Sequence, residues 1–489
     1  MALRALCILI IIFSTSTVPT IAAPAEPAAP QIELVVVREQ KSECLDPHAS
    51  YSGGDIEVCS LIYEGLVRPS LEVPVSWQPC LAENWKVNAD ATEYTFKIRK
   101  GVKFHDGDTC DAAAVKRSFD RMRDPRGPSA PAVMPYAEEF WSHIESVVAS
   151  DSVTLAVKLS RSDPRFLSTC GMPTAAIVSP KALDSMAKLD AKRRSDWLTR
   201  HSSGTGPFAA STQLEDGKIV LTAFDAYWQG KPRVSKITVK TTRDAKARAE
   251  ELRNGSADII DRVPPDFWGD LEKLTSVHLH AQAGQNLGYL AMNCDAKCKF
   301  ITAELHVREA ISLAIDRDPL CALNAPAAIA QFVLLPECVA GHPKGYKPQL
   351  DEVKRDDALK RAKKLIADAG AVGAEVSLVF PKLPRPYLPK PNATADILRG
   401  QLEAIGLKVV LEPRAMVEIA EGIAKGNYAL LLLGWMGETG DAEDFWKPLL
   451  GGKNGPGDNN TARFWDKDVQ AEIDAACGEL DKTKRAEKF

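Results

Sequence analysis

Hydrophobic and polar residues alternate in the first part of the chain, as they do in a strand with one buried face. In residues 91–107, "ATEYTFKIRKGVKFHDG", single polar residues separate the apolar Tyr94, Phe96 and Ile98. This period of two predicts a half-buried strand, and the glycines that follow it predict turns. Asp111 is then placed to accept backbone N–H bonds at the start of the next helix.

Beyond residue 285 the pattern changes to amphipathic helices that alternate with short apolar strands. The expected strands are residues 375–380, 407–412 and 427–435, and the helices between them are residues 394–406 and 417–426. Helices between strands imply parallel pairs joined by crossover connections. In open sheets of this kind, ligands bind outside the carboxyl ends of the strands. A ligand site is therefore expected directly after the last of these strands.

That last strand leads into an acidic loop. Residues 430–446, "LLLLGWMGETGDAEDFW", contain four leucines and then Glu438, Asp441, Glu443 and Asp444. Charged side chains are rarely buried without partners, so this loop either faces water, meets a metal ion or anchors a charged ligand. The carboxylates lack the alternate spacing of a calcium loop, and we expect no metal here. Asp441 is expected to stabilise the loop by accepting backbone N–H bonds.

The N-terminus has the layout of a secretory signal. Residues 1–23, "MALRALCILIIIFSTSTVPTIAA", combine one early arginine, a short apolar run and small residues at the end. The apolar run is too short to span a bilayer, so cleavage is expected between about Thr20 and Glu26, with an uncut anchor as the alternative. The Pro/Ala-rich residues 24–30 are expected to form a flexible leader. The mature protein is therefore predicted to be exported and soluble.

Composition narrows the possible functions. A chain of 489 residues is expected to form two or three domains. With 61 basic and 65 acidic residues, the net charge is −4, which gives no reason to expect a nucleic acid as partner. No GxSxG or HExxH motif and no nucleophile with an evident base partner is present, so we expect no enzyme and no cofactor.

Eleven cysteines are present, and removal of Cys7 with the signal leaves ten. Export permits disulfides, but the pairings stay open. Cys294 and Cys298 are close enough in sequence to form a small bridge or to supply two metal ligands. A structural zinc site is not expected, because no CxxC pair occurs.

Four stretches identify a family resemblance. Residues 61–69 "LIYEGLVRP", 81–108 "LAENWKVNADATEYTFKIRKGVKFHDGD", 204–208 "GTGPF" and 307–318 "VREAISLAIDRD" resemble the peptide/nickel family of extracellular solute-binding proteins. They occur in that family's order and approximate spacing. The resemblance implies an α/β, two-lobed, periplasmic-binding-protein-like fold of type II, in the three-domain peptide-binding class, with mixed sheets and a hinge between the lobes.

The same resemblance implies a domain organisation. Residues 31–66 and 204–285 would form domain I, residues 67–203 a domain inserted into it, and residues 286–489 the second lobe. Family members continue through a further helix and strand that return to domain I. Because this chain stops at Phe489, the return segment is expected to be missing.

Within the family, residues 434–446 look most like the loop of dipeptide-binding proteins. Glu438 stands where that pattern has the aspartate that holds the ligand's ammonium group. Asn392 stands where those relatives have an arginine for the ligand carboxylate; Lys390 is a possible substitute, although an exposed, solvated lysine is the simpler interpretation. Trp435 and Tyr387 are candidates to stack on ligand side chains, and Asp441 is included among the candidate ligand-binding residues.

The resemblance implies the periplasmic substrate-binding component of an ABC importer. It would be a monomer that captures di- or oligopeptides in a closing cleft and delivers them to membrane permease subunits. The alternatives are a binder of nickel or another small solute, a chemosensory receptor subunit, and a secreted hydrolase.

Overall fold

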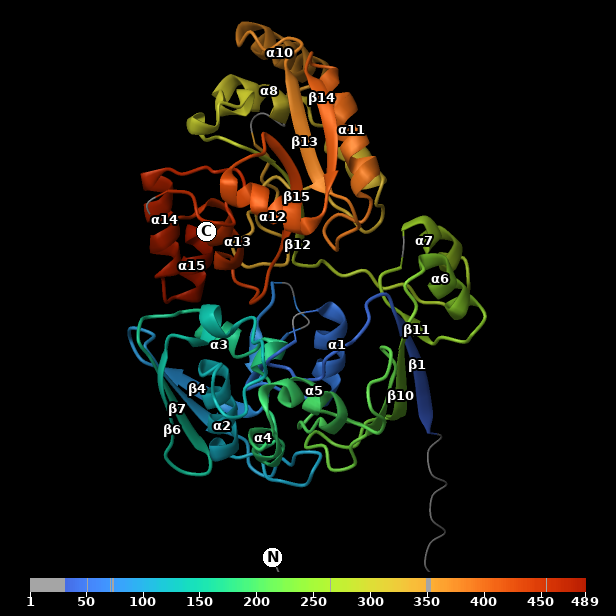
Figure 1. Ribbon diagram of the computed structural model, residues 1–489, viewed down its shortest axis with the longest axis vertical. Helices are drawn as coiled ribbons and strands as arrows, with labels where there is room; N and C mark the ends of the chain where they lie inside the picture. The colour runs from blue at the N-terminus through green and yellow to red at the C-terminus, as the bar shows by residue number, and fades with distance from the viewer. Residues whose placement is uncertain are drawn as a thin grey trace, which may run out of the picture.

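The chain forms two lobes, one above the other in Figure 1. The computed structural model describes residues 31–489 except residues 51, 71, 73, 264, 349–352 and 454. The expected signal segment and leader, residues 1–23 and 24–30, lie outside the described residues. Within the described ranges, no helix has the length and apolar character needed to cross a membrane.

The lower lobe contains a mixed five-stranded sheet in the order β11-β1-β10-β9-β8. Strand β1 pairs in parallel with β10 and β11, while β9 is antiparallel to β10 and β8. The bounds are β1 (Ile32–Arg38), β8 (Phe208–Ala210), β9 (Ile219–Ala223), β10 (Val234–Thr241) and β11 (Ile259–Ile260). Both stretches assigned to domain I thus contribute strands to one sheet, while the domain boundaries stay a prediction.

Five helices accompany this sheet. They are α1 (Gly53–Ile62), α4 (Pro180–Ala187), α5 (Ala191–His201), α6 (Ala245–Arg253) and α7 (Pro265–Glu272). Helix α1 begins at Ser52, whose side chain accepts a hydrogen bond from the Asp55 backbone N–H. Val58 and Ile62 of this helix are fully buried in the same core as Leu221 of β9.

A second sheet of the lower lobe is wholly antiparallel, in the order β4-β5-β7-β6. Its strand β5 confirms the predicted half-buried strand, because Tyr94, Phe96 and Ile98 are buried on one face. The predicted helix cap is also confirmed, since Asp111 accepts a bond from the Ala114 backbone N–H at the start of α2. The elements here are β2 (Val67–Pro69), β3 (Trp77–Pro79), β4 (Ala82–Val87), β5 (Glu93–Ile98), α2 (Ala112–Arg123), the π-helix η1 (Ala137–Trp141), β6 (Ile144–Ala149), β7 (Thr154–Leu159), α3 (Phe166–Thr169) and η2 (Pro173–Ala175).

The upper lobe contains a four-stranded mixed sheet in the order β12-β15-β13-β14. Strand β13 is parallel to both β14 and β15, as the helix–strand alternation predicted, and β12 is antiparallel to β15. The strands are β12 (Asn286–Met292), β13 (Glu375–Pro381), β14 (Lys408–Arg414) and β15 (Leu430–Met436). The helices are η3 (Ala296–Cys298), η4 (Ile301–Ala303), α8 (Leu305–Ala314), α9 (Arg317–Ala322), α10 (Arg355–Asp368), α11 (Pro391–Glu403), α12 (Met416–Lys425), α13 (Glu443–Leu450), α14 (Lys467–Cys477) and α15 (Lys482–Lys488).

A buried charge pair joins the two parts of the lower lobe. Arg121 of α2 donates to the carboxylate of Asp46 at 2.8 Å and to Nδ1 of His48 at 2.7 Å. His48 Nε2 donates to the Ala176 carbonyl at 2.8 Å. Burial, with Arg121 beside it, lowers the pKa of His48 to about 4, so the ring is neutral at pH 7. Because Arg121 and Asp46 are sealed from water, each requires the other.

We therefore expect Arg121→Leu to lower the free energy of unfolding by about 3–5 kcal/mol, because it leaves Asp46 buried without a partner. The matched control is Arg117→Leu on the same helix, whose partner Asp184 is 59% exposed, against 0% for Asp46. Loss of that exposed pair should lower the free energy of unfolding by less than about 1 kcal/mol. Urea unfolding measures the free energy of unfolding of both variants. Equal decreases would contradict the conclusion that the buried Arg121–Asp46 pair matters more than the exposed one.

Candidate ligand site between the lobes

The site begins where the buried strand β15 leaves its sheet. Leu430 to Leu433 are buried between β12 and β13, as four consecutive leucines require. The chain emerges at Met436, turns through a short loop and enters α13 at Glu443. The acidic residues therefore lie beyond the carboxyl end of the strand, the position in which α/β sheets present ligands.

Asp444 holds this loop in shape. Its Oδ2 accepts hydrogen bonds from the Glu438 backbone N–H at 3.0 Å and from the Thr439 hydroxyl at 2.9 Å. Its carbonyl accepts the Trp435 indole N–H at 2.7 Å. Asp444 is buried, and burial raises its pKa while the bonds from Thr439 oppose the rise. The position of Glu438 is therefore set by a carboxylate six residues further along the chain.

Two cations of the upper lobe neutralise the other acids. Arg485 of α15 contacts Asp441 at 2.9 Å and Glu443 at 2.8 Å, and Lys447 contacts Glu443 at 2.7 Å. Asp441 also accepts the Glu443 backbone N–H at 2.8 Å, which agrees with the loop-stabilising role expected for it. The sequence analysis missed Arg485. Its segment, "DKTKRAEKF", is highly charged like an exposed helix, and nothing in it indicates a contact with a loop 44 residues earlier.

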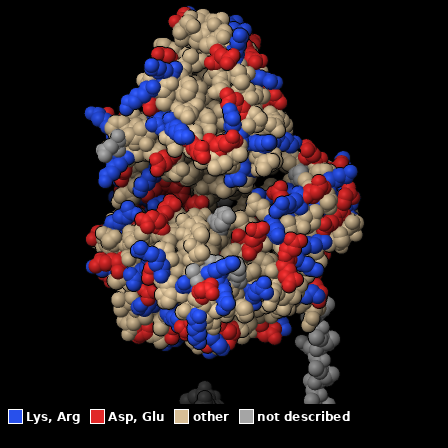
Figure 2. Space-filling view, in the orientation of Figure 1, with Lys and Arg blue, Asp and Glu red and all other residues tan. Residues whose placement is uncertain are grey.

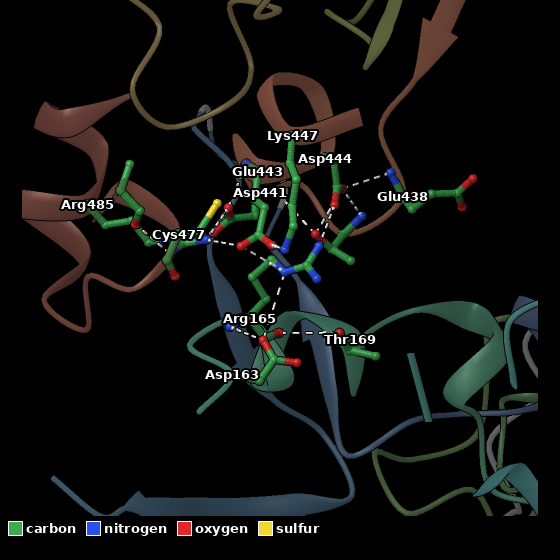
Figure 3. A network of polar contacts seen from close by, with 12 residues as sticks. Asp163, Arg165, Thr169, Glu438, Asp441, Glu443, Asp444, Lys447, Cys477 and Arg485 are labelled. Carbon is green, nitrogen blue, oxygen red and sulfur yellow. Dashed lines mark hydrogen bonds and ion pairs between the residues drawn. The ribbon is translucent and has the colours of Figure 1, made fainter. Parts of the chain in front are cut away.

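A third cation, Arg165, comes from the lower lobe. It precedes α3, and its guanidinium lies 3.1 Å from Glu443 and 3.4 Å from Asp444 in the upper lobe (Figure 3). Burial alone would raise the pKa of Glu443, but Arg165, followed by Lys447 and Arg485, lowers it below the ordinary value. The lobes therefore meet through a buried ion-pair network.

Glu438 stands apart from this network. Its carboxylate points away from the other acids in Figure 3, and no lysine or arginine among the described residues is ion-paired with it. The hydroxyl of Tyr136, in the lower lobe, donates a hydrogen bond to it. The residue is exposed to solvent, but the protein around its carboxylate removes part of the hydration and raises the pKa of Glu438 to about 7, with Asp444 and Glu139 adding to the rise.

Figure 2 shows a hollow between the two lobes, with acidic side chains at one end of it. Of the two aromatic candidates, Tyr387 is half-buried and lies over the glycines of the upper sheet, since a Cβ at Gly434 would meet its ring at 2.3 Å. Trp435 is also half-buried and packs with Phe445, with its indole nitrogen bonded to Asp444. Stacking of either ring on a ligand stays a prediction.

Arg385 is a candidate that the sequence analysis missed. It follows β13, the parallel neighbour of β15, so it emerges from the same edge of the sheet as Glu438. Its guanidinium lies 5.9 Å from the ring centroid of Tyr387, its Nε is buried without a hydrogen-bond partner, and no carboxylate of the described residues pairs with it. The signal was available in the sequence: in "VFPKLPRPY" Arg385 lies in the loop that follows a buried strand, a few residues after its end.

The two positions considered for the ligand carboxylate lie elsewhere. Asn392 is exposed on the first turn of α11. The interpretation of Lys390 as a solvated lysine is wrong: it is half-buried, contacts Asp266 of α7 at 2.8 Å and donates to the Leu323 carbonyl at 3.1 Å. Its ammonium is engaged because the fold brings α7 beside the loop before α11.

The ten cysteines that the structure describes are all free thiols, so the small bridge considered for Cys294 and Cys298 is not formed. In the described part of the chain, no group of three or more His, Cys, Asp or Glu side chains is placed to hold a metal ion.

The known proteins that are similar to this chain are solute-binding proteins. A family model described as "Bacterial extracellular solute-binding proteins, family 5 Middle" matches residues 76–457. Heme-binding protein A of Haemophilus influenzae is 29% identical over 428 residues, which cover 84% of this chain and 75% of that protein. The dipeptide-binding protein of Escherichia coli is 26% identical over 470 residues, which cover 93% and 85% of the two chains.

Solved structures show the same fold. HbpA2 from Haemophilus parasuis matches with a TM-score of 0.82 and 26% identity, covering 93% of this chain and 90% of that chain. DppA from Helicobacter pylori, in complex with the peptide STSA, matches with a TM-score of 0.72 and 24% identity, covering 93% and 88%. These likenesses confirm the predicted two-lobed α/β architecture.

Glu438 should make the stability of the ligand-free protein depend on pH. Because its pKa is raised by folding, its contribution is fully present below a pH of about 4.5 and is lost as the pH rises through about 7. The melting temperature of the wild type should fall over this interval relative to that of Glu438→Gln, whose amide does not titrate. Glu421→Gln, at an exposed position of α12, is the matched control, and parallel curves for wild type and Glu438→Gln would contradict the prediction.

Proposed function

Because the chain belongs to the bacterial extracellular solute-binding proteins of family 5, we propose that it is the substrate-binding component of an ABC importer for short peptides. The family model spans most of the chain, and several relatives are named as dipeptide- or di/tripeptide-binding proteins. Members of this family bind solutes, so the expected role is capture and delivery rather than catalysis. The hydrophobic segment at residues 1–23 supports export.

The observation that carries the proposal is the unpaired carboxylate of Glu438. Three other acids beside it, Asp441, Glu443 and Asp444, are neutralised by arginines or a lysine, whereas Glu438 has only the Tyr136 hydroxyl. A carboxylate that has lost part of its hydration without gaining a cation can bind one from a ligand, and closure around that ligand would remove more water. The α-ammonium of a peptide fits this requirement.

Arg385 supports the other end of the same ligand. It carries a positive charge at the same sheet edge, with no carboxylate partner among the described residues. A planar guanidinium can hold a carboxylate through two parallel hydrogen bonds. Glu438 would bind an ammonium group and Arg385 a carboxylate group at the same edge of the sheet. A short peptide with both termini free carries these two groups. We propose Arg385, rather than Asn392 or Lys390, as the residue that binds the peptide C-terminus.

The first test compares alanine di- to pentapeptides with their N-acetylated forms by calorimetry, with hemin and nickel as competing solutes. The wild type should prefer the free amine by about 2 kcal/mol or more, as expected when a buried charged pair loses one partner. Glu438→Gln should remove most of that preference. Equal binding of both forms by the wild type would rule out Glu438 as the ammonium anchor. Binding of hemin or nickel alone would rule out peptides as the substrate.

The second test concerns the carboxylate end. Arg385→Gln should weaken binding of the free peptide by about 2 kcal/mol, while binding of the C-terminally amidated peptide should change much less. Asn392→Ala is the matched control and should leave both affinities unchanged, because its side chain is exposed on α11. If Arg385→Gln weakens the two peptides equally, the arginine acts on the fold and not on the ligand carboxylate.

A further inference from the structure

The acidic cluster around α13 receives one of its cations from the opposite lobe. The upper lobe places Asp441, Glu443 and Asp444 in one cluster, and among its described residues the cations that pair with this cluster are Arg485 and Lys447. The third cation, Arg165, belongs to the lower lobe, where the neighbouring Phe166 is buried in the core of the antiparallel sheet. Without Arg165 the cluster keeps one buried negative charge in excess.

The carboxylate of Asp444 connects Arg165 to the ligand anchor. One of its oxygens faces the Arg165 guanidinium at 3.4 Å, and the other accepts the backbone N–H of Glu438 at 3.0 Å and the hydroxyl of Thr439 at 2.9 Å. Asp163 of the lower lobe holds Arg165 in place: its carboxylate accepts the Arg165 backbone N–H at 3.0 Å and lies 3.9 Å from the guanidinium. A chain of polar contacts thus runs from one lobe, through Asp444, to the loop that carries Glu438 (Figure 3).

We propose that Arg165 is a positioning residue that fixes the Glu438 loop only when the lobes are closed. This rests on the proposed function, because it assigns Glu438 to a cationic ligand. Arg165 does not bind the ligand; it stabilises the closed lobes and the orientation of the anchor together. When the lobes separate, Asp444 and Glu443 lose this cation, so Arg165 acts on the closed state and not on the open one.

Two consequences distinguish this role from ordinary structural support. An interaction made only after closure changes the dissociation rate of a ligand more than its association rate. It also shifts the ligand-free protein toward the closed arrangement, because the ion pairs form without a ligand. Neither effect is expected of an arginine that only holds its own lobe together.

The test compares Arg165→Gln with wild type in two measurements. Stopped-flow binding of alanine di- to pentapeptides should show a dissociation rate that is higher on the order of tenfold, with little change in the association rate. Small-angle X-ray scattering of the ligand-free protein should show a larger radius of gyration for the variant. Arg165→Lys, which keeps the charge but cannot span two carboxylates, should be intermediate in both.

Controls separate the possible failures. Arg117→Gln, whose partner Asp184 lies in the same lobe, should behave as wild type in both measurements. In a background that carries both Glu443→Gln and Asp444→Asn, Arg165→Gln should add less than about a twofold change, because both of its upper-lobe partners are already gone. Full additivity there, or unchanged dissociation and scattering for Arg165→Gln, would overturn the proposal. If the wild type binds no peptide, the proposed function fails, while the scattering comparison still decides whether Arg165 closes the lobes.

Discussion

The structure depends on one electrostatic constraint: the carboxylates at the end of a buried strand must each find a compensating charge. The burial of β15 between two neighbouring strands delivers Asp441, Glu443 and Asp444 into a poorly hydrated region. A buried charge without a partner destabilises the folded state. Cations from α15, from α13 itself and from the opposite lobe pair with these acids. The contact between the lobes follows from this requirement.

The same constraint explains why Glu438 has a raised pKa and no cationic partner among the described residues. Its neighbours use the available cations, so its own carboxylate is left with one hydroxyl donor and a raised pKa. In the proposed function a cationic ligand would supply the missing partner, and the attraction between the two charges would strengthen as lobe closure removes water. The asymmetry between neutralised structural acids and one acid without a cation is therefore what supports the loop as a candidate binding site.

Contacts on both sides of the hollow bring the lobes together. Lys390 reaches Asp266, and the backbone N–H of Val75 in the lower lobe donates to the Cys338 carbonyl in the upper lobe at 3.3 Å. These contacts are weaker supports than the buried Arg165 pairs, because Asp266 is 71% exposed and surrounded by water. The buried contacts of Arg165 are therefore the stronger link between the lobes, and they lie beside the candidate ligand anchor.

The sequence alone determined several of the elements and the sheet edge at which the candidate site lies. Alternation gave the strand containing Tyr94 and Phe96, and the helix–strand order gave the parallel pairing of β13 with β14 and β15. The hydrophobic periodicity predicts these elements because the burial of one face of a helix or strand depends on residues that are close in sequence. The partners of the acidic loop depended on tertiary structure: Arg165 lies 279 positions from Asp444, and Arg485 lies 44 from Asp441. No sequence pattern marks an arginine as buried or paired, because its environment is made by segments that only folding brings together.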